Sequence, residues 1–219
     1  MTNPLQPDGS SKNEPTGDLA LQSSQAHRQV FVNLVNRDAI ARLDAVAIGS
    51  QLRSQKSETP SLDWSRGNPT QMSVFHIAGG CTEPGSLAVD SHHQRLFAAC
   101  NNMKLAVMNA LTGEVVTTLP TGPGTDAVGY DADRSLIYTA NGGANGSLTV
   151  IRQDVTDTYA VIQNLPTRQR ARTLAVNPAS GEVYLVTDLL GVNLAESGGI
   201  GTLRTAPVNG SFQVLVVGN

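Results

Sequence analysis

Apolar residues occur along this chain in short runs that are separated by polar turns. A typical run is LAVD at residues 87–90, which is followed by the turn SHHQR and then by LFAACN at residues 96–101. Short runs bounded by turn residues predict strands rather than long helices. We therefore expect an all-β chain built mainly of antiparallel hairpins.

The order of these runs repeats along the chain, which predicts a β-propeller. The second strand of the unit recurs at Leu96, Leu136 and Val183, at intervals of 40 and 47 residues. Repeats of roughly 40–50 residues with four short strands each are typical of propeller blades. We expect about four four-stranded antiparallel blades, at residues 18–80, 81–124, 125–170 and 171–219.

Several segments break the repeat. Residues 1–17 are polar and predict a disordered lead-in, and residues 49–70 and 189–209 read as insertions. Residues 38–48 carry alanines that would suit a helix, but their alignment with the third strands of other repeats favours a strand. The last repeat ends in a third strand at 210–218, so we expect its blade to lack a fourth strand and the propeller to be incomplete.

The amino-acid composition argues against some classes of protein, such as nucleic-acid-binding and membrane-spanning proteins. The 219 residues are 40% hydrophobic, which is enough for a sizeable core, and their formal charge of −3 gives no sign of a nucleic-acid surface. No apolar run reaches the roughly 18 residues of a membrane helix, and no secretory signal peptide is visible. Glycine and proline are frequent, at 21 and 11 residues, which fits a turn-rich chain.

Several tetrapeptides resemble those of the YVTN-repeat β-propeller family. The resemblance lies in VFVN (30–33), IYTAN (137–141) and VYLVTD (183–188), in the repeat openings Glu14-Pro15 and Glu83-Pro84, and in the ending GSFQVLVVGN. It covers about residues 14–219 and implies the C-terminal portion of a propeller with about seven blades. The resemblance further implies a periplasmic or extracellular location for the full-length parent. At the level of the fold, it implies similarity to lactonases, quinoprotein dehydrogenases and surface-layer proteins.

Polar side chains at the ends of the predicted strands form the candidate binding site. In a propeller, the start of each first strand and the end of each second strand open on the same mouth of the central channel. The residues at these positions are Glu14, Glu83, Asp126, Arg172, Asn33, Asn101, Asn141 and Asp188. Such a ring could bind a small polar ligand or a cation such as Ca²⁺ through oxygen donors. The alternative is that these residues only cap local turns.

Cys81 and Cys100 are the only cysteines, and they flank one predicted hairpin. Cys81 precedes the first strand of its blade and Cys100 ends the second, so the two lie side by side in an antiparallel pair. A disulfide is the expected outcome, and two free thiols are the alternative. The histidines show no zinc-type spacing and His92-His93 falls in a polar turn, so we predict no metal site of that kind.

No catalytic motif stands out, so we expect a non-enzymatic scaffold that binds a protein or a small polar ligand. A lactonase-like hydrolase using the carboxylates of the channel mouth and Arg172 is the first alternative. An oxidoreductase related to quinoproteins is the second, although no cofactor motif is visible. The open edges of the terminal blades also predict self-association with other chains.

Overall fold

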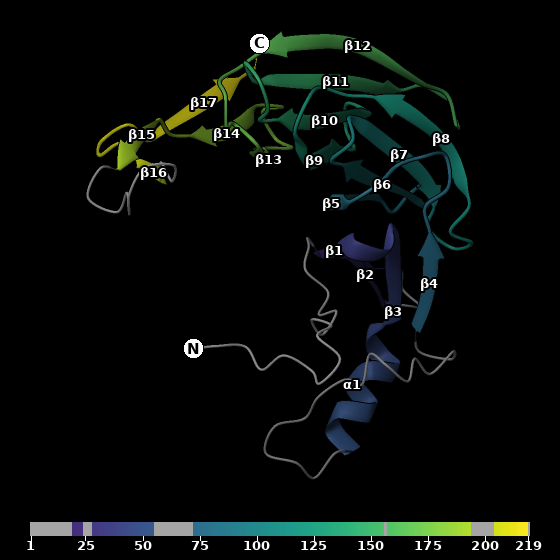
Figure 1. Ribbon diagram of the computed structural model, residues 1–219. Coiled ribbons are helices and arrows are strands. Elements are labelled where there is room, and N and C mark those ends of the chain that lie inside the picture. The colour runs from purple at the N-terminus through teal and green to yellow at the C-terminus, as the bar shows by residue number, and fades with distance from the viewer. Residues whose placement is uncertain (1–18, 24–27, 55–71, 156, 194–203, 219) are drawn as a thin grey trace.

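The computed structural model describes residues 19–23, 28–54, 72–155, 157–193 and 204–218. Four blade sheets form a curved array in which the strands pair in sequence order (Figure 1). The first sheet holds β1 (Leu19–Ser23), β2 (Arg28–Leu34), β3 (Ala39–Asp44) and β4 (Met72–His76). The second holds β5 (Pro84–Asp90), β6 (Arg95–Cys100), β7 (Lys104–Asn109) and β8 (Val115–Pro120).

The third sheet has the same form and the fourth is shorter. The third holds β9 (Thr125–Asp131), β10 (Leu136–Asn141), β11 (Ser147–Gln153) and β12 (Tyr159–Pro166). The fourth has three strands, β13 (Thr173–Val176), β14 (Val183–Thr187) and β17 (Gln213–Val217), with β14 in the middle. All pairings are antiparallel. The predicted fold class, an all-β chain forming an incomplete propeller, is confirmed.

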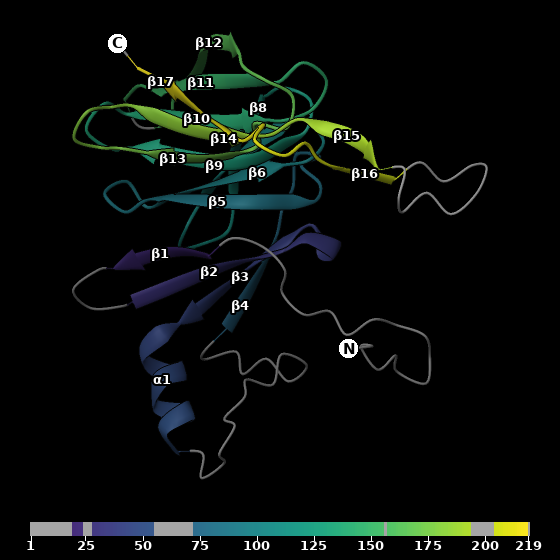
Figure 2. The same cartoon turned by 90° about the vertical axis from the view of Figure 1, so that its left-hand side faces the viewer.

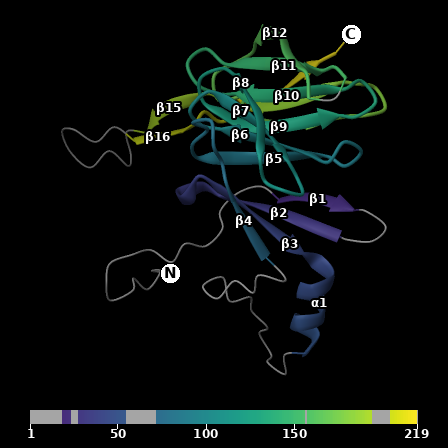
Figure 3. The same ribbon diagram turned by 90° about the vertical axis from the view of Figure 1, so that its right-hand side faces the viewer.

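The first strands β1, β5, β9 and β13 lie on the concave side of the array, while β4, β8 and β12 lie on its convex rim (Figure 1). Neighbouring first strands lie next to one another, as β5 and β9 do. Each blade therefore presents its two faces to its neighbours, and the sheets stack in layers (Figure 3).

The hydrophobic core consists of the layers between these faces. Phe31 and Ile40 of the first blade pack against Leu96 and Met108 of the second. The next layer contains Phe97 and Val107 of the second blade with Ile137 and Ile151 of the third. A third layer joins Tyr138 and Leu148 to Val183 and Leu185. Each strand thus buries both of its faces, which explains why the strands are apolar throughout and alternate only weakly.

Helix α1 (Ala45–Ser54) is the main departure from the predicted pattern. The strand expected over 38–48 ends at Asp44, and the helix begins four residues before the predicted insertion 49–70. Asp44 Oδ1 accepts the backbone N–H groups of Val46 and Ala47 at 2.9 and 3.0 Å, so it acts as the N-cap. An N-cap followed by alanines therefore favours the helix over a longer strand.

Two smaller elements also lie outside the predicted strands. A 3₁₀ turn, η1 (Val35–Arg37), joins β2 to β3. The expected insertion 189–209 contains a hairpin of β15 (Leu190–Asn193) and β16 (Arg204–Pro207). The lead-in 1–17 and most of the insertion 49–70 lie outside the described residues. Among the described helices, none has the length and apolar character needed to cross a membrane.

Candidate functional site

The strand order places the predicted site residues at one mouth of the array. Glu83 and Arg172 immediately precede the first strands of their blades, and Asp126 is the second residue of β9. Asn101, Asn141 and Asp188 end or follow the second strands, which run antiparallel to the first. Glu14 lies outside the described residues. The remaining side chains share a face, but their contacts divide them into separate groups.

Glu83 belongs to the junction between the first and second blades. Its Oε2 accepts a hydrogen bond from Asn101 Nδ2 at 2.8 Å. Its backbone N–H donates to Asp38 Oδ1 of the first blade at 2.7 Å. Glu83 has a positive φ of 52°, which a non-glycine residue adopts only when its surroundings hold it there. The Glu83 carboxylate is therefore committed to local contacts on the side of the array away from Arg172.

Asn141 is fully buried, and its side chain forms hydrogen bonds inside the third blade. Its Oδ1 accepts the hydroxyl of Thr125 at 2.7 Å and that of Thr139 at 3.2 Å. Its Nδ2 donates to Ser147 and Thr149 at 3.0 and 2.9 Å. Two acceptor and two donor positions are all that a side-chain amide offers. The side chain of Asn141 therefore has no polar atom left for a ligand, and its partners are side-chain hydroxyls rather than the backbone of a turn.

Asn33 occupies the corresponding place in the first blade, and it differs. It is also fully buried, but neither Oδ1 nor Nδ2 has a hydrogen-bond partner among the described residues. Asn33 and Asn141 therefore differ in their hydrogen bonding, although they occupy equivalent positions of the repeat.

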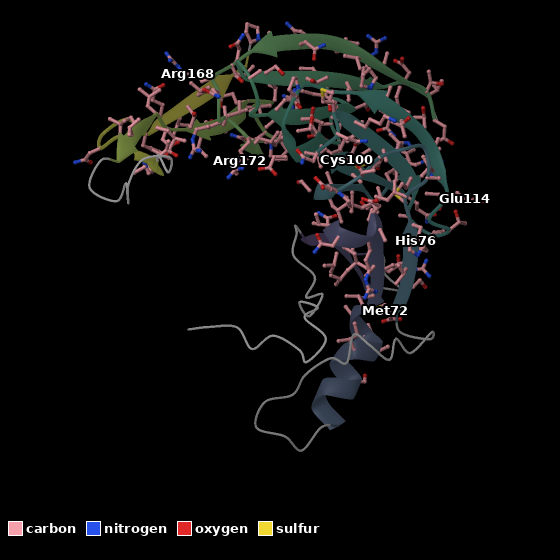
Figure 4. The ribbon with its side chains drawn as sticks, viewed as in Figure 1. Met72, His76, Cys100, Glu114, Arg168 and Arg172 are labelled. Atoms are coloured by element: carbon pink, nitrogen blue, oxygen red, sulfur yellow. A yellow bond between two sulfur atoms is a disulfide. The ribbon has the colours of Figure 1, made fainter. Side chains whose placement is uncertain are left out.

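The segment RQRAR at residues 168–172 brings charges together at the junction between the third and fourth blades. Arg170 Nε lies 2.7 Å from Asp188 Oδ1, and both side chains are partly buried. Arg172 Nε lies 3.5 Å from Asp126 Oδ2, and both of these side chains are about half exposed. Arg168 makes no ion pair with any residue that the structure describes. Arg168 and Arg172 lie at the fourth-blade end of the array, whereas Met72 and His76 lie at the opposite end (Figure 4).

A cavity of about 570 Å³ opens at this junction. Its polar lining includes Asn145, Arg168, Gln169, Arg170, Asp188 and Gln213. Thr167 also lines it, and the Thr167 hydroxyl is buried without a hydrogen-bond partner among the described residues. A cavity of this size suits a small molecule, and its arginines outnumber its single carboxylate. The loop between β10 and β11 holds the wall in place, because Gly146 contacts the backbone of Arg168 so closely that no side chain would fit there.

The opposite mouth holds a polar network that sequence reasoning missed. Asp90, which is 2% exposed, accepts His93 Nδ1 at 2.6 Å and Gln153 Nε2 at 3.1 Å. The Tyr130 hydroxyl donates to Gln153 Oε1 at 2.7 Å. Burial alone would raise the pKa of Asp90, but the hydrogen bonds from His93 and Gln153 outweigh it and hold the pKa below its ordinary value. Burial and the nearby Asp90 charge raise the pKa of Tyr130.

This network joins the second blade to the third, since Asp90 and His93 belong to the second blade and Tyr130 and Gln153 to the third. The signal in the sequence was the aspartate that ends the strand LAVD just before His92 and His93. The partners Tyr130 and Gln153 lie some 40 and 63 residues away, which no local pattern reveals.

Cys81 and Cys100 form a disulfide, with their Cα atoms 5.6 Å apart. Both side chains are buried in the layer between the first two blades. Within the described ranges, no group of three or more His, Cys, Asp or Glu side chains is arranged to hold a metal ion.

The comparisons with known proteins support the fold. No family model matches the sequence, and no curated protein does. The chain is similar in structure to hydrazine synthase of Kuenenia stuttgartiensis, with a TM-score of 0.59 and 15% identity over 94% of this chain. It is also similar to a protein of Bacteroides uniformis assigned as a 6-phosphogluconolactonase, with a TM-score of 0.57 and 15% identity over 98% of this chain. The chain spans 53% and 66% of the lengths of these two proteins.

At this level of identity the likeness concerns the fold alone. The neighbours and the sheet layout together show a β-propeller-like fold. The finer resemblance to YVTN repeats has no support from a family model.

Proposed function

We propose that this chain is a non-enzymatic β-propeller scaffold that binds a small, polar, negatively charged ligand in the cavity between the third and fourth blades. The observation that carries the proposal is the pairing pattern of the arginines. Asp188 forms an ion pair with Arg170, whereas Arg168 has no ion-pair partner among the described residues that line the same cavity. An anion bound there would supply the missing partner.

The unpartnered hydroxyl of Thr167 adds a second feature. A buried hydroxyl without a partner costs roughly 1–3 kcal/mol, and a ligand oxygen in the cavity would remove that cost. Asn145, Gln169 and Gln213 line the same cavity and can both donate and accept hydrogen bonds. A carboxylate or phosphate carried on a hydroxylated small molecule matches this set of groups.

The proposal is tested by calorimetric titration with gluconate and 6-phosphogluconate as probes. We expect saturable binding of at least one probe, and Arg168→Gln should weaken it about tenfold or more, because a charge-assisted hydrogen bond contributes roughly 1.5–3 kcal/mol. Arg152→Gln is the matched control, since Arg152 is an exposed arginine paired with Asp154 outside the cavity. Absence of binding, or equal effects of the two variants, would refute the proposal.

A lactonase-like hydrolase is the second candidate. The contact between Asp126 and Arg172 favours it, because a carboxylate and a guanidinium side by side can orient a water molecule and a carbonyl oxygen. The likeness in fold to the Bacteroides uniformis protein is compatible with this role. Glu83, which the sequence grouped with these two residues, lies at another junction. Hydrolysis of a sugar lactone that is lost in Asp126→Asn would establish this alternative over the scaffold.

Two further functional hypotheses, a Ca²⁺ site and an oxidoreductase role, have less support. Ca²⁺ held by oxygen donors such as Glu83 and Asn101 is tested by titrating the ion in the same calorimeter. An oxidoreductase role related to quinoproteins rests on the shared fold alone.

We further infer membership of the YVTN-repeat family and a periplasmic or extracellular location. The disulfide between Cys81 and Cys100 supports such a location, because disulfides persist mainly in oxidising compartments. Fractionation of cells that express the complete parent gene, with thiol labelling of the protein, tests this inference. A reduced protein in the cytosolic fraction would contradict it.

A further inference from the structure

Two adjacent histidines, His92 and His93, lie in the turn that joins β5 to β6, and the proposed function does not use them. His92 is exposed, and the side chain of His93 is 41% exposed. The turn lies at the end of the blades opposite the hairpin of β15 and β16, which extends to the right in Figure 2. Both rings are therefore accessible from solvent, at the mouth that does not hold the anion cavity.

Asp90 holds this turn in one conformation. Its Oδ1 accepts hydrogen bonds from the backbone N–H groups of His92 and His93 at 3.0 and 3.1 Å. Its Oδ2 accepts hydrogen bonds from His93 Nδ1 at 2.6 Å and from Gln153 Nε2 at 3.1 Å. The Asp90 side chain is only 2% exposed, so its oxygens are occupied by protein groups rather than by bulk water. The backbone of the turn and the ring of His93 are thus fixed before any ligand binds.

The contact with Asp90 also decides which nitrogen of each histidine carries a hydrogen atom. A carboxylate only accepts hydrogen bonds, so in the neutral ring His93 Nδ1 carries the hydrogen and His93 Nε2 keeps a lone pair. His92 Nδ1 lies 3.1 Å from His93 Nε2. Two ligand nitrogens that are each about 2.0–2.1 Å from one metal ion lie about 2.9–3.4 Å apart at ordinary bond angles. The separation of these two ring nitrogens therefore suits two ligands of a single ion.

The charges around the two rings favour a cation. Asp90 and Asp157 both interact electrostatically with His93. Arg95 carries the compensating positive charge, and its Nε lies 2.6 Å from Asp157 Oδ1 while its Nη1 donates to the backbone oxygen of His93 at 2.8 Å. Arg95 is therefore paired with Asp157, whereas the hydrogen-bond donors of Asp90 are uncharged when His93 is neutral. The surroundings of the two rings keep a net negative charge.

We propose that His92 Nδ1 and His93 Nε2 bind one divalent transition-metal ion, with water at its remaining positions and with Asp90 as the positioning residue behind His93. In metal sites, a ligating histidine usually donates its other ring N–H to a carboxylate, as His93 does to Asp90. Imidazole binds Cu²⁺, Ni²⁺ and Zn²⁺, and affinity in this series is highest for Cu²⁺. Neither neutral ring has to lose a proton, because His92 needs only to carry its hydrogen on Nε2 instead of Nδ1. Such an open site uses fewer protein ligands than a closed structural zinc site.

The proposal is tested by calorimetric titration of the metal-free full chain with Cu²⁺, followed by electron paramagnetic resonance of the product. We expect one ion per chain at the two histidines, with hyperfine splitting from two imidazole nitrogens. His92→Gln should weaken binding about tenfold or more, because one of the two protein ligands is lost. His92 is exposed in a turn, so this variant should keep the circular dichroism spectrum of the wild type. His76→Gln is the matched control, since His76 is an exposed histidine on β4.

Asp90→Asn distinguishes a positioned site from two unrelated surface histidines. Asparagine lacks the charge that holds the His93 ring, so the affinity for Cu²⁺ should fall about 10–100-fold with an unchanged circular dichroism spectrum. If Asp90→Asn does not fold, Gln153→Met takes its place, because it removes one hydrogen bond to Asp90 and should also weaken binding.

Three results would overturn the proposal. These are no binding of Cu²⁺, a loss in His92→Gln no larger than that in His76→Gln, and full affinity in the variant that perturbs Asp90, which would make the binding adventitious. Anion binding in the cavity can fail without affecting any of these results, so the two proposals are tested separately.

Discussion

Replacing Asn141 by leucine should destabilise the protein far more than the same change at Asn101, although both residues lie at the end of a second strand. Leucine has a similar volume but no hydrogen-bonding group, so Asn141→Leu removes four buried hydrogen bonds. Each such bond contributes roughly 1 kcal/mol net, and Thr125 keeps Gly122 O as an acceptor. We therefore expect a loss of about 3 kcal/mol in the free energy of unfolding.

The paired variant isolates burial as the cause. Asn101 is exposed and makes one side-chain hydrogen bond, to Glu83, so Asn101→Leu should change stability by no more than about 0.5 kcal/mol. Urea denaturation followed by circular dichroism measures both values, with the slope against urea expected to stay constant. Equal losses in the two variants would show that the network around Asn141 contributes nothing beyond an exposed asparagine.

Three further outcomes are expected. Reduction of the Cys81–Cys100 disulfide, whose cysteines are 19 residues apart, should lower the free energy of unfolding by about 3 kcal/mol, measured by urea denaturation with and without reductant. The pKa of Asp90 is lower in the folded than in the unfolded protein, so the ionised carboxylate stabilises the fold at pH values above the unfolded pKa. This stabilisation should disappear as the pH falls through the folded pKa. In Asp90→Asn, the free energy of unfolding should therefore change less with pH over this acidic range. Burial and the Asp157 charge raise the pKa of Tyr159 to about 12, so ultraviolet titration should show one fewer tyrosine ionising near pH 12 in Tyr159→Phe.

The architecture was predictable because the repeat places every strand in a similar environment. Runs such as LFAACN and LIYTAN are buried on both faces in the structure, as β6 and β10. The helix α1 was not predictable from the repeat, since it has no equivalent in the described parts of the other blades and depends on the capping contact of Asp44. The strands β15 and β16 likewise have no counterpart among the described strands of the other blades.

The sequence predicted which face of the molecule the candidate site residues share, but not which of their side chains are in contact. Topology alone placed Glu83, Asp126 and Arg172 at one mouth. Side-chain pairing depends on distances between blades, which a repeat pattern does not contain. The burial of Asn141, and the absence of an ion-pair partner for Arg168 among the described residues, are consequences of such distances.

The layered core makes each blade depend on its immediate neighbours, so stability should fall toward an end that has one neighbour only. Among the described blades, the fourth packs against the third alone, so we expect its local opening to be visible as fast amide exchange in β13, β14 and β17. A ligand in the cavity requires this blade to be closed, because residues of β14 and β17 and of the loops beside them line the cavity. Ligand binding should therefore slow the same exchange, so that occupancy of the cavity can be followed through the folding equilibrium of one blade.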